Sequence, residues 1–124
     1  MPSLAFAIKI KPGKSDEVRQ LYEEILRDKS EQEHQRRRAI GVRRFKVWHQ
    51  HTPEDMFIVY LEADDLEAGT RQWVNHEDEH EAWLQQRLQE LTEWDMSHHA
   101  PGPPADLIYD WHEEHGPSAE EHNV

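Results

Sequence analysis

Hydrophobic residues near the start of the chain alternate with small or polar residues, as they do in a β-strand. The large ones occupy every second position and therefore share one face of the predicted strand; they are Leu4, Phe6, Ile8 and Ile10. Beyond Pro12 and Gly13 the spacing changes to three or four residues, which is typical of an amphipathic helix. The apolar stripe of this helix consists of Val18, Leu21, Tyr22, Ile25 and Leu26.

The stripe stops at residue 27, and residues 27–38 are polar on every side. We expect this half of the helix to project beyond the sheet, with its arginines at the negative end of the helix and Gly41 ending it. A basic patch is formed by Arg36, Arg37, Arg38, Arg43, Arg44 and Lys46. We expect this patch to be solvated, or to meet the acidic half of a partner chain, rather than to grip an anionic ligand.

Residues 43–51 and 56–63 are predicted to form a β-hairpin around the four-residue loop 52–55. If His51 pairs with Met56, one face of the pair carries Phe45, Val47, His49, His51, Met56, Ile58 and Tyr60. The other face then carries Lys46, Trp48, Gln50, Phe57, Val59 and Leu61. A slip of one residue would exchange these sets.

The second half of the chain predicts a helical region from Leu66 to Val74 and a helix through Leu84, Leu88 and Leu91. Residues 97–106 hold three prolines and are predicted to be a linker. Residues 105–111 are predicted to form a last strand. We expect residues 112–124, an acidic tail that contains histidines, to be disordered because they offer nothing to bury. Residues 1–111 are thus predicted to be a single domain.

The order strand, helix, strand, strand, helix, strand predicts a ferredoxin-like α+β fold. This fold has a four-stranded antiparallel sheet with two main helices on one face. The other face is largely apolar in this sequence, and a homodimer formed through it would keep that face out of water.

The charge of the chain limits its partners. There are 26 acidic and 14 basic side chains, with a net charge of −12, which argues against nucleic acid and anionic membranes. Residues 1–53 hold 12 basic and 7 acidic side chains, whereas residues 54–124 hold 2 and 19. This asymmetry predicts basic and acidic surfaces side by side, although solvated helix faces are the simpler explanation.

The number of cysteines and the length of the apolar runs exclude further classes of protein and of functional site. The chain has no cysteine, which excludes a disulfide framework, a thiol nucleophile and a Cys-based metal site. The early apolar run ends at Lys9 and is too short for a signal peptide or a membrane span. We therefore expect a cytoplasmic protein.

Residues 76–80 spell His-Glu-Asp-Glu-His, the spacing at which zinc peptidases hold their metal. We do not expect a metallopeptidase, because Asp78 and Glu79 are charged where a buried zinc helix needs apolar residues. There is also no obvious third ligand downstream.

The two histidines nevertheless fall on the apolar stripe of the helix, which consists of Trp73, His76, His80, Leu84, Leu88 and Leu91. Glu77, Asp78, Glu79 and Glu81 then point elsewhere. Inward imidazoles at this spacing could act as acid and base, share a divalent metal or hold a haem. The structural alternative is that each histidine is partly buried and satisfied by one hydrogen bond.

Further residues complete the predicted pocket. His49 and Tyr60 are candidates for its opposite wall, as catalytic partners of His76 and His80. Trp48, Trp73 and Trp83 are candidates for lining an aromatic ligand pocket, although tryptophans at these spacings are more often plain core.

The strand Ile8-Lys9-Ile10, the following Lys11-Pro12-Gly13-Lys14, the hairpin, the histidine-bearing helix and the closing Leu107–Trp111 resemble dimeric α+β barrel proteins. More narrowly, residues 4–111 resemble a family of small bacterial ferredoxin-like proteins of unknown function. The resemblance implies two chains pairing into an α+β barrel. The wider superfamily includes cofactor-independent monooxygenases of antibiotic biosynthesis, haem-degrading enzymes, muconolactone isomerases, polyketide cyclases and sugar mutarotases, whose pockets lie between sheet and helices.

Two functions remain open from the sequence. The first is a small dimeric enzyme that acts on an aromatic or polyketide-like molecule by oxygenation, isomerisation or cyclisation. It would use no cofactor, a divalent metal or a haem. The second is a non-catalytic ligand-binding or protein-interaction module whose histidines are structural.

Overall fold

Three strands form one antiparallel sheet with the last of them in its centre. The structure, a computed structural model, describes residues 2–71, 78–94 and 105–121. The sheet order is β1-β3-β2, in which β1 spans Ser3–Lys9, β2 spans Val42–Gln50 and β3 spans Met56–Ala63. The predicted first strand and hairpin are present, and the chain has an α+β fold.

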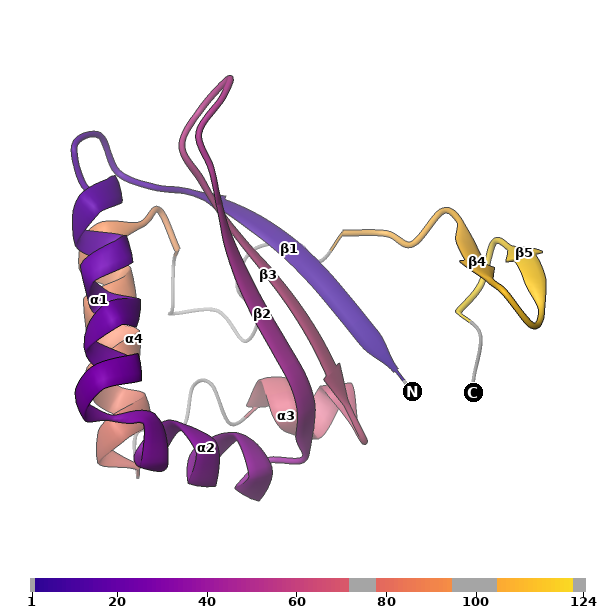
Figure 1. The fold of residues 1–124 in the computed structure, drawn as a ribbon, viewed down its shortest axis with the longest axis horizontal. Coiled ribbons are helices and arrows are strands. Elements are labelled where there is room, and N and C mark those ends of the chain that lie inside the picture. The colour runs from indigo at the N-terminus through magenta and orange to yellow at the C-terminus, as the bar shows by residue number, and fades with distance from the viewer. Residues whose placement is uncertain (1, 72–77, 95–104, 122–124) are drawn as a thin grey trace.

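The helices lie on one side of this sheet (Figure 1). They are α1 (Ser15–Asp28), α2 (Ser30–Ala39), α3 (Leu66–Arg71) and α4 (Glu79–Leu91). Helices α1 and α4 pack side by side, and α2 contacts both α4 and β2. The polar segment that was expected to project beyond the sheet therefore folds back onto it. The helix breaks at Lys29, and α2 packs because its inward polar side chains find charged partners.

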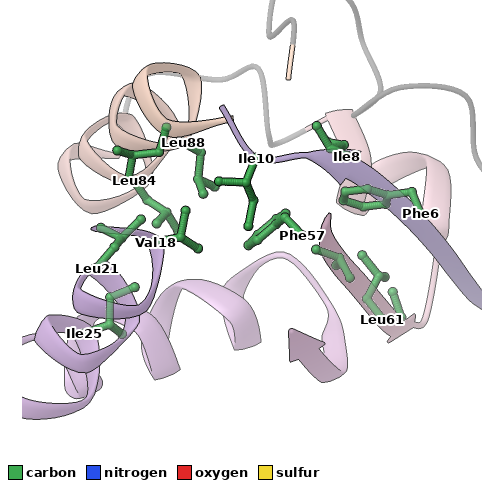
Figure 2. Packing of buried hydrophobic residues seen from close by; sticks show 13 residues of the cluster. Phe6, Ile8, Ile10, Val18, Leu21, Ile25, Phe57, Leu61, Leu84 and Leu88 are labelled. Atoms are coloured by element: carbon green, nitrogen blue, oxygen red, sulfur yellow. The ribbon is translucent and has the colours of Figure 1, made fainter. Parts of the chain in front are cut away.

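The core lies between the sheet and helices α1 and α4, and Figure 2 shows it from close by. The buried side chains include Phe6, Ile8 and Ile10 from the first strand and its extension, and Val18, Leu21 and Ile25 from α1. They also include Phe57, Val59 and Leu61 from β3, and Leu84, Leu88 and Leu91 from α4. Both predicted stripes are confirmed at these positions. Leu26 departs from its stripe and is 76% exposed.

The pairing of the hairpin differs by one residue from the prediction. Gln50, rather than His51, pairs with Met56, so that Val47 lies opposite Val59 and Trp48 opposite Ile58. The predicted face sets were therefore wrong. This register buries Phe57, Val59 and Leu61 of β3, each of which is 1% exposed, and it partly buries the inward residues of β2. The inward set is Phe45, Val47, His49, Phe57, Val59 and Leu61.

In the part of the chain that the structure describes, the predicted fourth strand does not belong to this sheet. The backbone N–H of Ala105 donates to the carbonyl of Ala5 at 3.0 Å, but the segment then leaves the sheet (Figure 1). Asp110–His112 forms β4, which pairs with β5 (Gly116–Ser118) in a separate two-stranded sheet. Part of the tail that was expected to be disordered thus belongs to this small sheet.

The sheet face opposite the helices carries several partly exposed apolar residues. It holds Lys46, Trp48, Gln50, Met56, Ile58 and Tyr60. Trp48 is 49% exposed. Among the described residues, no helix is long and apolar enough to cross a membrane.

Candidate functional site

A buried arginine on α2 contacts both β2 and α4. Arg37 is only 8% exposed, and its guanidinium lies over the ring of Phe45, 4.7 Å from the ring centre. Its Nε donates to Oε1 of Glu33 at 2.6 Å, and its Nη1 lies 3.4 Å from Oε2 of Glu81 on α4. A charge buried this deeply requires such partners, because removing it from water costs several kcal/mol.

Glu33 connects this arginine to a predicted site residue. Its second carboxylate oxygen accepts a hydrogen bond from Nε2 of His80 at 2.5 Å. Burial would raise the pKa of Glu33, but the hydrogen bond from His80 and the charge of Arg37 outweigh burial and lower that pKa. Glu33 is therefore an ionised carboxylate that fixes the orientation of both partners.

His80 keeps one nitrogen available. With Nε2 donating to Glu33, Nδ1 is the ring nitrogen that carries the lone pair in the neutral form of the imidazole. In the described ranges, Nδ1 is buried and has no hydrogen-bond partner. The pairing resembles the carboxylate–imidazole couples in which one ring nitrogen is held and the other exchanges a proton.

The pKa of Glu81 is shifted in the opposite direction to that of Glu33. Glu81 is 3% exposed, and burial raises its pKa although Arg37 and Arg36 act to lower it. Nη1 of Arg37 and Nε of Arg36 lie 3.4 and 3.6 Å from Oε2 of Glu81, and among the described residues this oxygen accepts no hydrogen bond. Asp78 fixes the position of Glu81 by capping α4, because its side chain accepts a hydrogen bond from the Glu81 backbone N–H at 2.8 Å.

A small cavity lies beside Glu81. Its volume of about 20 Å³ is enough for one water-sized group. The lining residues are Phe6, Tyr22, Arg37, Phe45, Phe57, Val59, Glu81, Leu84, Gln85, Leu88 and Trp94. The cavity therefore has apolar walls and a few polar groups.

Two of those polar groups lack partners within the part of the chain that the structure describes. Neither atom of the Gln85 side-chain amide makes a hydrogen bond, although this residue is 3% exposed. The hydroxyl of Tyr22 is likewise buried without a partner, and burial raises its pKa. Each unpaired buried polar group costs about 1–3 kcal/mol, so these residues are ones that a bound polar group would stabilise.

An open depression lies on the other side of His80, between α2 and the start of α4. Its volume is about 710 Å³, within the usual range for small-molecule sites. It is lined by Lys29, Gln32, Gln35, Arg36, Ala39, Asp78, Glu79, His80 and Trp83. The rings of His80 and Trp83 lie 5.9 Å apart, and Nζ of Lys29 lies 4.5 Å from the centre of the Trp83 ring.

The structure brings together only some of the residues that the sequence predicted for the site. His80 and Trp83 share the depression, whereas His76 and Trp73 lie outside the described residues. Tyr60 and Trp48 are on the sheet face away from the helices, where the Tyr60 hydroxyl donates to Glu62 at 2.7 Å. His49 faces the helix side but contacts Asp55 and Arg19 near the hairpin end. The prediction that His49 and Tyr60 share a wall was wrong because of the register.

Sequence reasoning missed Glu33, Arg37, Glu81 and Gln85, all of which contribute to this site. Glu81 was expected to point away from the sheet, and Arg37 to be solvated. One signal was available. Glu33 with Arg37 and Glu81 with Gln85 are pairs four residues apart, and the second pair adjoins the buried Leu84 and Leu88.

Comparisons of the chain with models of known protein families, with curated proteins and with solved structures gave no match.

We expect replacement of Glu33 by Gln to destabilise the fold at neutral pH by about 2 kcal/mol, since charged hydrogen bonds to Arg37 and His80 are lost. The pKa of Glu33 is lowered from 4.5 in the folded chain. Its contribution is therefore present above pH 4.5 and is lost as the pH falls through the folded pKa. Urea unfolding of Glu33→Gln and wild type at several pH values measures this difference.

The matched control is Glu31→Gln on the exposed side of the same helix, which should change stability by less than about 0.5 kcal/mol. Equal effects of the two substitutions at neutral pH would contradict the assignment.

Proposed function

We propose that the chain is a small enzyme that binds a small molecule between its sheet and helices and transfers a proton on it. The observation that supports this best is the pair of buried carboxyl groups on either side of Arg37. The pKa of Glu33 is lowered and that of Glu81 is raised. Titratable groups whose surroundings separate their pKa values are characteristic of acid–base sites.

Each group has a role in this proposal. Glu81 donates a proton, because a raised pKa keeps its carboxyl group protonated at higher pH. His80 accepts a proton on Nδ1, while Glu33 holds the hydrogen on Nε2. Gln85 orients the reacting polar group, which enters the small cavity.

The ligand enters from the open depression, where Trp83 offers an aromatic surface and Lys29 and Arg36 offer positive charge. Arg36 and His80 form the boundary with the buried cluster, so their side chains have to move when the ligand binds. A compact aromatic or polyketide-like molecule with a hydroxyl or carbonyl group fits these surroundings. Isomerisation or cyclisation needs only an acid and a base, and fits these residues better than oxygenation does.

A haem or a metal bound to Nε2 of His80 would have to displace Glu33, and among the described residues no group of three possible metal ligands includes His80. The cavity beside Glu81 is also far smaller than a haem. The side chains present therefore do not fit such a cofactor at His80, and no step of the proposal uses one.

We further propose that the chain completes a ferredoxin-like fold as a homodimer. The outer sheet face with Trp48, Met56 and Ile58 is one support. The other is the segment after Ala105, where Leu107, Ile108, Tyr109 and Trp111 are each more than half exposed. A second copy presents the same two apolar surfaces, so that each can cover the other. In the dimer, this segment would add the fourth strand beside β1.

The exposed residues of that segment also favour a second function, a protein-interaction module with structural histidines. In that case binding depends on residues 107–111 and on the uneven charge, and not on Gln85. Substitutions at Gln85 and substitutions on the outer sheet face distinguish the two functions, because each function depends on only one of these places.

Adjacent glutamines on α4 provide a matched test of the proposed site. Among the described residues, Gln85 is buried without a hydrogen-bond partner, whereas Gln86 is exposed. We expect Gln85→Leu to raise the free energy of unfolding by about 1 kcal/mol, since it removes an unpaired buried amide. A panel of hydroxylated aromatic and polyketide-like compounds, screened by thermal shift and calorimetry, should bind wild type and Gln86→Leu but not Gln85→Leu.

Binding that survives in Gln85→Leu would contradict the proposed site, and so would the absence of binding by any compound to wild type. Destabilisation by Gln85→Leu would mean that this glutamine is needed for folding.

Light scattering tests the homodimer. We expect wild type to be a dimer and Trp48→Glu to be a monomer, because a charge on the outer face has to be desolvated in the interface. Leu26→Glu, at a position that is 76% exposed on α1, should remain dimeric. A monomeric wild type, or a Trp48→Glu variant that remains dimeric, would contradict this interface.

A further inference from the structure

The β2–β3 hairpin brings three potential metal ligands together beside the N-terminal end of α1. They lie away from Arg37 and its partners Glu33 and Glu81. His49 belongs to β2, and His51 and Asp55 are the first and last residues of the loop that joins β2 to β3. The rings of His49 and His51 lie 4.1 Å apart, and Nε2 of His49 lies 2.7 Å from Oδ1 of Asp55. One ligand atom from each side chain lies within 4.8 Å of the others.

A positive charge already lies between the histidines. Nε of Arg19 donates to Nδ1 of His49 at 3.1 Å, and its Nη2 lies 2.9 Å from Nε2 of His51. A guanidinium can only donate hydrogen bonds, so both imidazole nitrogens present lone pairs to it. Imidazole lone pairs aimed at one cation are also what a metal ion requires.

The backbone fixes the position of these side chains. His49 pairs with Phe57 across the hairpin, and its side chain is 11% exposed. The carbonyl of Asp55 accepts a hydrogen bond from the Ile10 backbone N–H at 3.0 Å. The Asp55 carboxylate lies against Nε2 of His49, so that the other ring nitrogen of His49 points away from it, toward Arg19.

We propose that Nδ1 of His49 and Nε2 of His51 bind a divalent transition metal ion, with Zn²⁺ as the best fit, and that the metal displaces the Arg19 side chain. Asp55 orients the metal-binding ring of His49 through its contact with Nε2. Imidazoles are common zinc ligands, and a carboxylate on the second ring nitrogen is their usual outer partner, while water completes the coordination. Calcium and magnesium prefer sites made only of oxygen ligands. The hollow at this site is also lined by Gly13, Ser15 and Asp16, which leaves space for a water or a ligand on the metal.

Displacement of Arg19 distinguishes this site from casual binding by exposed histidines. The guanidinium competes with the metal for the same lone pairs, so its removal should strengthen metal binding. A second group, His112, Glu114 and His115, lies near β4 and β5 and provides the control, since it lies outside the hollow that Arg19 lines.

Calorimetric titration of the full untagged chain with Zn²⁺ tests the proposal. We expect wild type to bind one Zn²⁺ ion whose affinity falls about tenfold or more in His51→Ala and in Asp55→Asn. Arg19→Met should bind Zn²⁺ more tightly than wild type. The double variant His112→Ala/His115→Ala should bind with wild-type affinity at this site. Circular dichroism checks that each variant is folded.

Three results would overturn the proposal. The first is wild-type affinity in His51→Ala or Asp55→Asn. The second is loss of binding in His112→Ala/His115→Ala, and the third is an Arg19→Met variant that binds no more tightly than wild type.

Discussion

The burial of Arg37 is the constraint on which the arrangement of α2, α4 and the candidate site depends. A guanidinium cannot lose its charge inside a protein, so its surroundings have to supply negative groups. Glu33 and Glu81 supply them from two different helices. Because Glu33 also binds His80 and Glu81 also faces Arg36, a single buried charge organises two carboxyl groups, an imidazole and a second arginine.

The uneven distribution of charge along the chain now has a structural explanation in part. Arg36 and Arg37 come from the basic half of the sequence, and Glu81 from the acidic half. Their side chains meet where α2 packs against α4. The pairing of Arg43 with Asp64 at 2.7 Å joins the two halves at the surface. The asymmetry thus serves contacts within one chain and is not only a feature of solvated faces.

The sequence predicted the apolar parts of the fold well and the polar site poorly. Periodicity located the first strand, the stripe of α1 and Leu84, Leu88 and Leu91 because each repeats with the spacing of its element. Periodicity also located the two strands of the hairpin but not their register. Both faces of β2 and β3 carry apolar residues, so two registers that differ by one residue fit the sequence pattern almost equally well. The pattern indicated that Arg37 and Glu81 are solvated, because a buried ion pair shows in the sequence only as two charges. Among the residues to which we give a role in proton transfer, only His80 was predicted from the sequence to face inward.

The central claim is that one fold shifts the pKa values of two buried glutamates in opposite directions around a single arginine. A ¹³C NMR titration of the side-chain carboxyl carbons, assigned to Glu33 and Glu81 by substitution, measures this directly. The account predicts that Glu33 titrates below pH 4.5 and Glu81 above it. Titration of both groups at the same pH, or in the reverse order, would contradict it.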